Sequence, residues 1–244
     1  MVKVGCSGFP VARGTYFRQL GAVEIRSAFV RPPKPETAAA WRAEAPEDFE
    51  FALHAWQLIT HLPSSPSYGK LRAADCPRMH LCGHFKGTEE VARAWARVEA
   101  VAEVLRPSFI VFRTPSTFYP NADHLRDMYR FFKGIRRGPR TLAWQPTGSW
   151  EETLIRKVCE DLNLTHATLP ESVCQRGAAA YYRVPAPRGI NPKPFDAAAL
   201  AARLAGKNAY VFFDTPDSWN EARRFLDLVR PGQRPASARR LCAD

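Results

Sequence analysis

Long hydrophobic runs are missing from this sequence of 244 residues. No apolar stretch approaches the roughly 18 residues that a membrane helix needs, and the first residues lead directly into a strand-like run without a signal-peptide pattern. Cysteine is sparse, and the six cysteines are scattered along the chain. Free thiols in a reducing compartment are therefore expected rather than a disulfide framework. We predict a cytoplasmic protein with no membrane partner.

Several motifs of catalysis and cofactor binding are absent as well. The sequence has no Walker loop and no dinucleotide fingerprint, and no elbow motif supports a nucleophilic serine or cysteine. Cys76, His80, Cys82 and His84 fall within nine residues, but the paired spacing of a zinc site is missing and no second half-site follows. Unrelated thiols and imidazoles in a loop are favoured over zinc. We predict no metal and assign neither a cofactor nor an oligomeric state.

Positive charge is in excess. The chain has 35 Lys and Arg residues against 24 Asp and Glu residues, a formal charge of +11. Basic side chains gain affinity for polyanions by releasing counterions from phosphates. This balance favours a phosphate-bearing partner such as nucleic acid, and a basic but inert surface is the alternative.

Strand-like and helix-like segments alternate along the chain. In residues 49–54 (FEFALH), apolar residues recur at every second position, which is the period of a strand. Strands are predicted at residues 2–6, 22–27, 49–54, 108–113, 141–145, 165–169, 178–184 and 208–213. Helices are predicted at residues 16–20, 36–44, 88–105, 122–133, 149–162, 196–205 and 218–229, with a cap-like start at Thr88 and with Ser149 as a cap.

The alternation predicts an α/β fold with one domain. Eight strand-like runs without a long linker indicate a single (β/α)8 TIM-type barrel over residues 1–229. The Pro-, Arg- and Ala-rich residues 230–244 are predicted to be a loose C-terminal extension. Residues 62–85 exceed a routine connection and are a candidate loop of the active face.

Polar residues at the carboxyl ends of the strands are the candidates for a site, because chemistry lies at that face of such barrels. They are Ser7, Glu24, Arg26, His54, Arg113, Gln145, Thr147, Arg183 and Asp214. Three arginines against two carboxylates predict an anion site, with phosphate as the favoured ligand. The alternative is that Arg26 or Arg183 pairs internally with Glu24 or Asp214.

Catalytic and binding roles follow from these positions. Glu24 and Asp214 come from strands that both neighbour the first strand in a closed barrel, so we predict that they approach and divide acid and base roles. His54 is a third catalytic candidate, as a general base, although a lone His on a strand is more often a hydrogen-bonded core residue. Predicted ligand-binding residues are Arg26, Arg113 and Arg183 for phosphate, Gln145, and Trp56 and Tyr68 for stacking. Core packing is the alternative for each ring.

The sequence resembles domain of unknown function 72, the YecE-like proteins, over nearly its whole length. The matching stretches are VGCSGF, AVEIRSAFVRPP, FEFALHAWQLITH, the tetrapeptide from Tyr68 to Leu71, GHFKGTEEVARAW, FRTPSTF, LAWQPTGSW, YYRV and YVFFDT. The resemblance implies a TIM-type barrel and no defined reaction. It places Glu24, Lys70, Ser149, Trp150 and Arg183 on family positions, which adds Lys70 to the ligand-binding candidates.

Departures from the family pattern concentrate at the strand ends. Arg26 stands where the family has Asn, His54 where Lys is usual, and Asp214 where Asn is common. The usual Glu and Arg near the fifth strand are replaced by Gln145 and Thr147, and residues 185–187 stand where a Gly is expected. The resemblance therefore implies either a shifted substrate or binding without turnover.

These observations rank three functions. The first is a barrel that binds a phosphate-bearing ligand, with nucleic acid as the favoured class and phosphodiester hydrolysis as an accompanying activity. The second is an isomerase, lyase or hydrolase acting on a phosphorylated small metabolite. The third is a non-catalytic binding barrel. An extended basic groove would favour the first function, and a closed pocket would favour the second.

Overall fold

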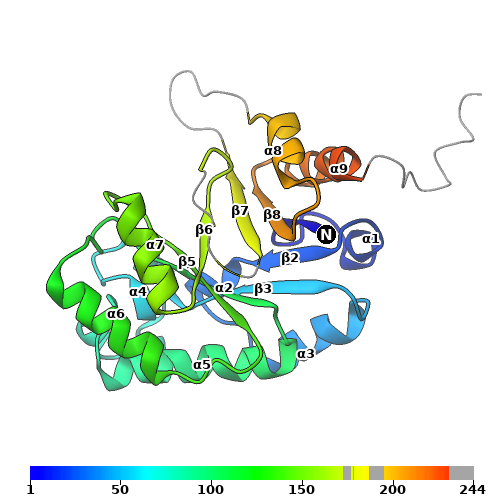
Figure 1. The fold of residues 1–244 in the computed structure, drawn as a ribbon. Helices are drawn as coiled ribbons and strands as arrows, with labels where there is room; N and C mark the ends of the chain where they lie inside the picture. The colour runs from blue at the N-terminus through cyan, green and yellow to red at the C-terminus, as the bar shows by residue number, and fades with distance from the viewer. Residues whose placement is uncertain (173–176, 178, 187–194, 231–244) are drawn as a thin grey trace, which may run out of the picture.

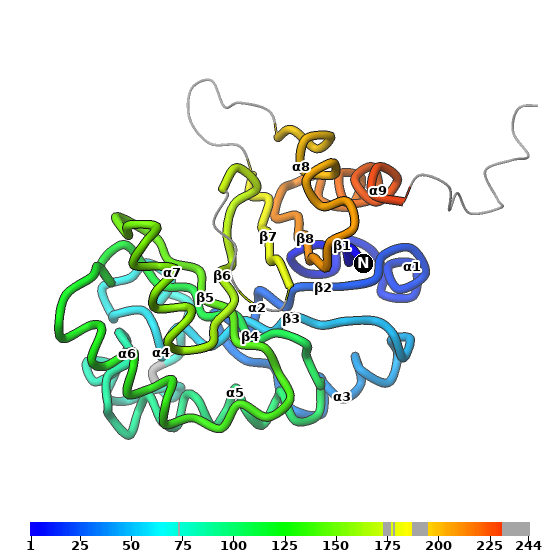
Figure 2. Tube along the Cα trace, viewed as in Figure 1, coloured from blue at the N-terminus to red at the C-terminus, as the bar shows by residue number. Residues whose placement is uncertain are grey.

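The computed structural model describes residues 1–172, 177, 179–186 and 195–230, apart from the side chain of residue 73. Its parallel strands close into one barrel in the order β1 to β8, with β8 paired to β1. Figure 1 shows the helices arranged around the outside of the strands. In Figure 2 the blue first strand lies beside the orange last strand. The predicted (β/α)8 barrel is confirmed.

The elements follow the predicted alternation. The strands are β1 (Val2–Ser7), β2 (Ala22–Ile25), β3 (Glu50–His54), β4 (Phe109–Arg113), β5 (Thr141–Gln145), β6 (Thr165–Thr168), β7 (Ala180–Pro185) and β8 (Ala209–Asp214). The α-helices are α1 (Arg13–Gln19), α2 (Ser27–Val30), α3 (Pro35–Glu44), α4 (Gln57–Thr60), α5 (Glu89–Leu105), α6 (Ala122–Gly134), α7 (Glu152–Asp161), α8 (Ala197–Leu204) and α9 (Ser218–Val229). Short 3-10 helices are η1 (Pro66–Lys70), η2 (Ala73–Asp75) and η3 (Met79–Leu81).

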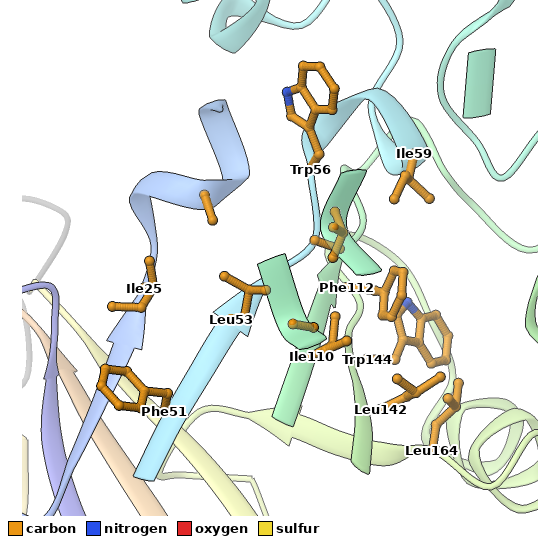
Figure 3. Close-up of a cluster of buried hydrophobic side chains, with 14 of the residues drawn as sticks. Ile25, Phe51, Leu53, Trp56, Ile59, Ile110, Phe112, Leu142, Trp144 and Leu164 are labelled. Carbon is orange, nitrogen blue, oxygen red and sulfur yellow. The ribbon is translucent and has the colours of Figure 1, made fainter. Parts of the chain in front are cut away.

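Side chains along each strand alternate between the helices and the lumen. Figure 3 shows part of the layer outside the strands, where Leu53, Ile110 and Trp144 pack together with their neighbours. The lumen contains a second cluster that includes Ala22, Ala52, Phe109, Val111, Ala143, Ala167, Tyr181, Tyr210 and Phe212. Its members are 0–8% exposed. At Gly5, β1 approaches β2 so closely that an added Cβ would lie 2.1 Å from the Ala22 carbonyl oxygen. The barrel is therefore a filled core that supports a surface site at one rim.

The observed helix starts agree only in part with those predicted from the sequence. The Thr88 hydroxyl accepts a hydrogen bond from Val91 N at 3.4 Å, so the expected cap of α5 is confirmed. The predicted cap of α7 is wrong: Glu151 precedes the helix and makes no side-chain cap bond, while Ser149 lies further upstream. Helices α2 and α4 were not predicted, because four residues are too few to show a helical period.

The predicted C-terminal extension lies almost entirely outside the described residues. Helix α9 ends at Val229, and residues 231–244 are not described. Of the helices that the structure describes, none is long and apolar enough to cross a bilayer.

Candidate anion site at the carboxyl ends of the strands

Polar side chains occupy the last lumen-facing position of most strands. Residues two apart on a strand share a face. Ala22 faces the lumen and so does Glu24, and the same relation holds for Tyr181 and Arg183. Because all strands are parallel, these positions gather at one rim. We call this group the mouth; it consists of Ser7, Glu24, Arg26, His54, Arg113, Gln145, Arg183 and Asp214.

Glu24 lies at the centre of the mouth and is 0% exposed. Tyr181 Oη donates to Glu24 Oε1 at 2.8 Å, and Ser7 Oγ donates to Oε2 at 2.5 Å. Arg183 Nε lies 3.0 Å from Oε1 and 3.1 Å from Oε2. Burial acts to raise the pKa of Glu24, but attraction to Arg183 and His54 outweighs burial and lowers it. Glu24 is therefore a permanent, enclosed carboxylate.

Arg183 uses all of its nitrogen atoms within the mouth. Besides the Nε contact, Nη1 donates to Gln145 Oε1 at 3.1 Å and Nη2 donates to Asp214 Oδ2 at 3.0 Å. Burial acts to lower the pKa of Arg183, but Glu24, Tyr181 and Asp214 raise it overall. Arg183 therefore lies between the two predicted acids, which meet through this guanidinium. This is the internal pairing that the sequence left open as an alternative.

Asp214 and Arg26 form the outer part of the same network. Arg26 Nη1 lies 3.1 Å from Asp214 Oδ1 and 3.2 Å from Oδ2. The Asp214 side chain is 22% exposed and the Arg26 side chain 54% exposed. Of the two predicted acids, only Asp214 reaches solvent, while Glu24 lies beneath it. Arg26 is the accessible member of the network, because Arg183 is only 6% exposed.

His54 is a buried imidazole next to Glu24. Its Nε2 lies 3.1 Å from Glu24 Oε1, and its side chain is 1% exposed. Burial lowers the pKa of His54, and attraction to Glu24 opposes this lowering only in part. Within the described part of the chain, neither ring nitrogen has a well-aligned hydrogen bond. Buried polar atoms normally have partners, so Nδ1 of His54 has unused hydrogen-bonding capacity within the mouth, while Nε2 lies against Glu24.

Arg113, Lys70 and Gln145 are the remaining predicted ligand-binding residues. Arg113 ends β4 and is half-buried, and its charge contributes to lowering the pKa values of His54 and His61. Lys70 ends η1 and is exposed, on the segment that follows β3. Gln145 is half-buried at the end of β5, where it accepts from Arg183. The structure thus brings Arg113 and Gln145 to the mouth and leaves Lys70 on the segment between β3 and α5.

Trp56 and Tyr68 were predicted to stack on a ligand, and the structure buries both rings instead. Trp56 is 5% exposed, and its Nε1 donates to the Val30 carbonyl at 2.9 Å. Tyr68 is 6% exposed, and its hydroxyl donates to the His61 carbonyl at 2.8 Å. Both rings are buried and both polar atoms are used within the protein. The structure therefore gives these two residues packing roles.

A chain of hydrogen-bonded histidines on the carboxyl side of the barrel was not predicted. His124 Nδ1 donates to the Tyr119 carbonyl at 2.7 Å. His84 Nδ1 lies 3.1 Å from His124 Nε2, and His84 Nε2 lies 3.3 Å from Thr117 Oγ1. Burial, His124 and Lys86 lower the pKa of His84 to about 4. The contacts join the segment before α5, the loop after β4 and the first turn of α6, so no local pattern could reveal them.

His84 belongs to a turn with unusual backbone angles. Gly83, His84 and Phe85 have φ values of 87°, 52° and 55°. Their N–H groups donate to the carbonyls of Leu58, Thr60 and Ile59 at 2.8, 3.2 and 2.9 Å. Left-handed backbone angles are uncommon for residues other than glycine, and they persist where surrounding contacts enforce them. The turn satisfies the last carbonyls of α4 and holds the segment against the barrel.

A hollow of about 450 Å³ borders the mouth at Gln145. Its lining includes His166 and Thr168 from β6, Trp150 before α7, and Glu152 on α7. Pockets of about 300–1,000 Å³ commonly hold small ligands. The sequence did not predict this hollow, because His166 and Thr168 do not lie at lumen-facing positions.

Metal ligands do not converge in the part of the chain that the structure describes. No group of at least three His, Cys, Asp or Glu side chains is placed there to hold a metal ion. Of the four residues of the weak zinc pattern, Cys76 contacts Cys82 and His84 contacts His124 instead.

The fold and the mouth define a (β/α)8 barrel with a buried ion network at the carboxyl ends of its strands. The chain belongs to the protein family of unknown function DUF72, whose sequence pattern matches residues 13–241. The predicted family is therefore confirmed. No functionally curated protein matches the sequence.

Solved structures with the same fold include relatives from that family. A DUF72 protein of Enterococcus faecalis, EF0366, is 14% identical with a TM-score of 0.64, covering 94% of this chain and 97% of its own. A DUF72 protein of Thermotoga maritima, TM1631, is 15% identical with a TM-score of 0.61, covering 94% and 99%. Endonuclease IV of Thermus thermophilus is 12% identical with a TM-score of 0.54, covering 94% and 98%. At these identities the likeness concerns the fold.

Proposed function

We propose that the mouth binds a phosphate-bearing ligand and that nucleic acid is the favoured class. The observation that carries this proposal is the charge of the mouth, where three guanidinium groups face two carboxylates. Both carboxylates are already paired with Arg183. Asp214 also pairs with Arg26, so three guanidinium groups against two carboxylates leave a net charge of +1 at the mouth, with Arg26 half-exposed toward the rim and Arg113 half-buried at the end of β4. Guanidinium groups suit the planar, two-point recognition of phosphate oxygens.

The role of each residue in the proposed site follows from the solvent exposure of its side chain. Arg26 and Arg113 contact the phosphate, and the exposed Lys70 adds a further positive charge. Glu24 and Arg183 are positioning residues, because one is 0% and the other 6% exposed. Asp214 is the acid available for proton transfer if phosphodiester hydrolysis accompanies binding. Glu24 cannot act as a general acid, because its lowered pKa keeps it ionised.

Nucleic acid is favoured over other phosphates by the charge of the whole chain. A formal charge of +11 supports attraction to a polyanion beyond the mouth itself. The fold shared with endonuclease IV supplies a precedent for this ligand class on a (β/α)8 barrel. That precedent is an analogy of fold and carries less weight than the charge.

The test is binding of fluorescently labelled single- and double-stranded oligonucleotides, followed by fluorescence anisotropy over a series of salt concentrations. We expect affinity at low salt and a linear fall of log K with log salt, because counterions are released from neutralised phosphates. Absence of binding at low salt would overturn nucleic acid as the ligand. Binding without strand cleavage would support a non-catalytic barrel.

A phosphorylated small metabolite is the second candidate, favoured by the hollow beside Gln145. Its volume of about 450 Å³ fits a metabolite better than a nucleic-acid strand. Competition distinguishes the two candidates: a sugar phosphate that displaces the oligonucleotide at low concentration supports the metabolite, whereas displacement only by polyanions supports nucleic acid.

A further inference from the structure

Two buried thiols lie in contact in the segment between β3 and α5. The Sγ atoms of Cys76 and Cys82 are 3.1 Å apart, and the two residues are 5% and 0% exposed. Helix η3 lies between them, and Cys82 N donates to the Met79 carbonyl at 2.9 Å to close this turn. The separation of the sulfur atoms is that of a hydrogen bond, so only a short movement is needed for a covalent bond to form.

We propose that Cys76 and Cys82 are a redox-active thiol pair, a modification site that closes into an intramolecular disulfide by exchange with a low-molecular-weight disulfide such as oxidised glutathione. Transient disulfides of this kind occur in reducing compartments as redox-sensing devices. The proposal is independent of the function proposed for the mouth.

The two thiols have different access to solvent, which assigns their roles. Cys76 lines a groove of about 560 Å³, together with Arg78, Arg93 and Arg97. Asp75 and Glu90 also line the groove, and Arg78 and Arg93 pair with Glu90. Three guanidinium groups against two carboxylates leave the lining a net charge of +1, which favours the approach of the carboxylates of glutathione. Cys82 is not part of that lining. Burial and contact with Cys76 also raise the pKa of Cys82 to about 12. Cys76 is therefore the attacking thiol and Cys82 the resolving thiol.

The thiol–disulfide exchange takes place in two steps. The Cys76 thiolate attacks one sulfur of oxidised glutathione, the glutathione S–S bond breaks, and one glutathione leaves and takes up a proton. The Cys82 thiolate then attacks the Cys76 sulfur, the mixed disulfide breaks, and the second glutathione leaves and takes up a proton. The two protein thiols are oxidised by two electrons, and one molecule of oxidised glutathione is reduced to two thiols.

The experiment uses the full chain, reduced and then equilibrated with mixtures of reduced and oxidised glutathione. Remaining thiols are alkylated, the protein is digested with trypsin, and the peptides are weighed by mass spectrometry. Arg78 lies between the two cysteines, so cleavage after it leaves residues 73–78 and 79–86 joined only by the disulfide. The buried thiols Cys6 and Cys159 are internal controls.

We expect the linked peptides at ratios where Cys6 and Cys159 are still fully alkylated. Alkylation of Cys76 and Cys82 to the same extent as Cys6 and Cys159 would overturn the proposal, and so would two separate glutathione adducts without a link. The variant Cys82→Ser tests the order of attack, because Cys76 should then retain one glutathione. The variant Cys76→Ser should leave Cys82 unmodified. The linked wild-type peptides test the pair itself, whether or not either variant folds.

Discussion

Glu24 and Arg183 form an ion pair that is almost closed to solvent: Arg183 Nε lies 3.0 Å from Glu24 Oε1, with side-chain exposures of 0% for Glu24 and 6% for Arg183. They come from β2 and β7, which are not neighbouring strands. The pair therefore spans the lumen and fixes the positions of Asp214 and Gln145, which bind the other end of the guanidinium.

Removing the Glu24 charge should destabilise the barrel. Glu24→Gln leaves Arg183 buried with half of its compensating charge, and breaking a buried pair costs about 3–5 kcal/mol. Urea unfolding measures this loss. Glu47→Gln is the matched control at an exposed position, where a change within about 0.5 kcal/mol is expected. Equal stability of the two variants would show that the pair contributes nothing measurable.

Two adjacent tyrosines provide a matched comparison. Tyr181→Phe removes a buried hydrogen bond to the Glu24 carboxylate, and we expect a loss of about 1.5–3 kcal/mol. Tyr182 is equally buried, but its hydroxyl has no hydrogen-bond partner among the described residues. Tyr182→Phe should therefore be neutral or slightly stabilising. Thermal and urea unfolding of both variants measure the difference, and similar losses in the two would contradict this assignment.

Stability should fall as the solution becomes mildly acidic. Burial, together with Arg113 and His84, lowers the pKa of His61 to about 3, and the pKa of His84 is lowered to about 4. Unfolded imidazoles have a pKa of about 6.5. Below that value the unfolded chain binds protons that the folded chain does not, so the free energy of unfolding decreases from pH about 6.5 toward 4.

The stabilising contribution of these histidines is complete above pH about 6.5 and does not increase further. Urea midpoints between pH about 8 and about 4.5 measure the effect. His84→Gln removes one of the titrating groups and should flatten the decrease. If the urea midpoint of this variant depends on pH as steeply as that of the wild type, His84 is not responsible for the loss of stability in acid.

The turn at Gly83 should tolerate no side chain. A Cβ there would lie 2.3 Å from the His61 carbonyl oxygen at a φ of 87°. Gly83→Ala should therefore cost more than about 2 kcal/mol, from the backbone angle and the clash together. Gly134, at the end of α6, has open space around its Cα, and Gly134→Ala is the control, expected to be neutral or stabilising. Comparable losses in the two variants would contradict the role of the turn.

Binding at the mouth should depend on Arg26. Arg26→Ala removes a half-exposed cation, and we expect weaker oligonucleotide binding and a salt slope reduced by about one. Arg18→Ala removes an exposed cation in the last turn of α1, toward the opposite rim, and should leave binding close to wild type. Fluorescence anisotropy at several salt concentrations compares them. Equal effects would indicate a diffuse electrostatic surface rather than a site.

Much of the fold could be predicted because strands alternate and helices repeat with fixed periods. Residues 141–145 form a strand with the predicted bounds, and the lumen-facing position of Glu24 follows from its spacing to Ala22. Local sequence patterns do not show which groups meet across the barrel. Arg183 was predicted to hold phosphate, yet three partners from other strands occupy it. Burial of Trp56 likewise depends on Val30, whose carbonyl comes from another segment.

Pairing of β1 with β8 places the two ends of the barrel wall side by side. Asp214 ends β8, whereas Glu24 lies near the start of the chain. The ribosome must therefore synthesise almost the entire barrel before Asp214, the last residue of the proposed anion site, is present. Ligand affinity at the mouth would thus report completed folding, since a nascent chain halted before β8 would lack Asp214 and could not bind in the same way.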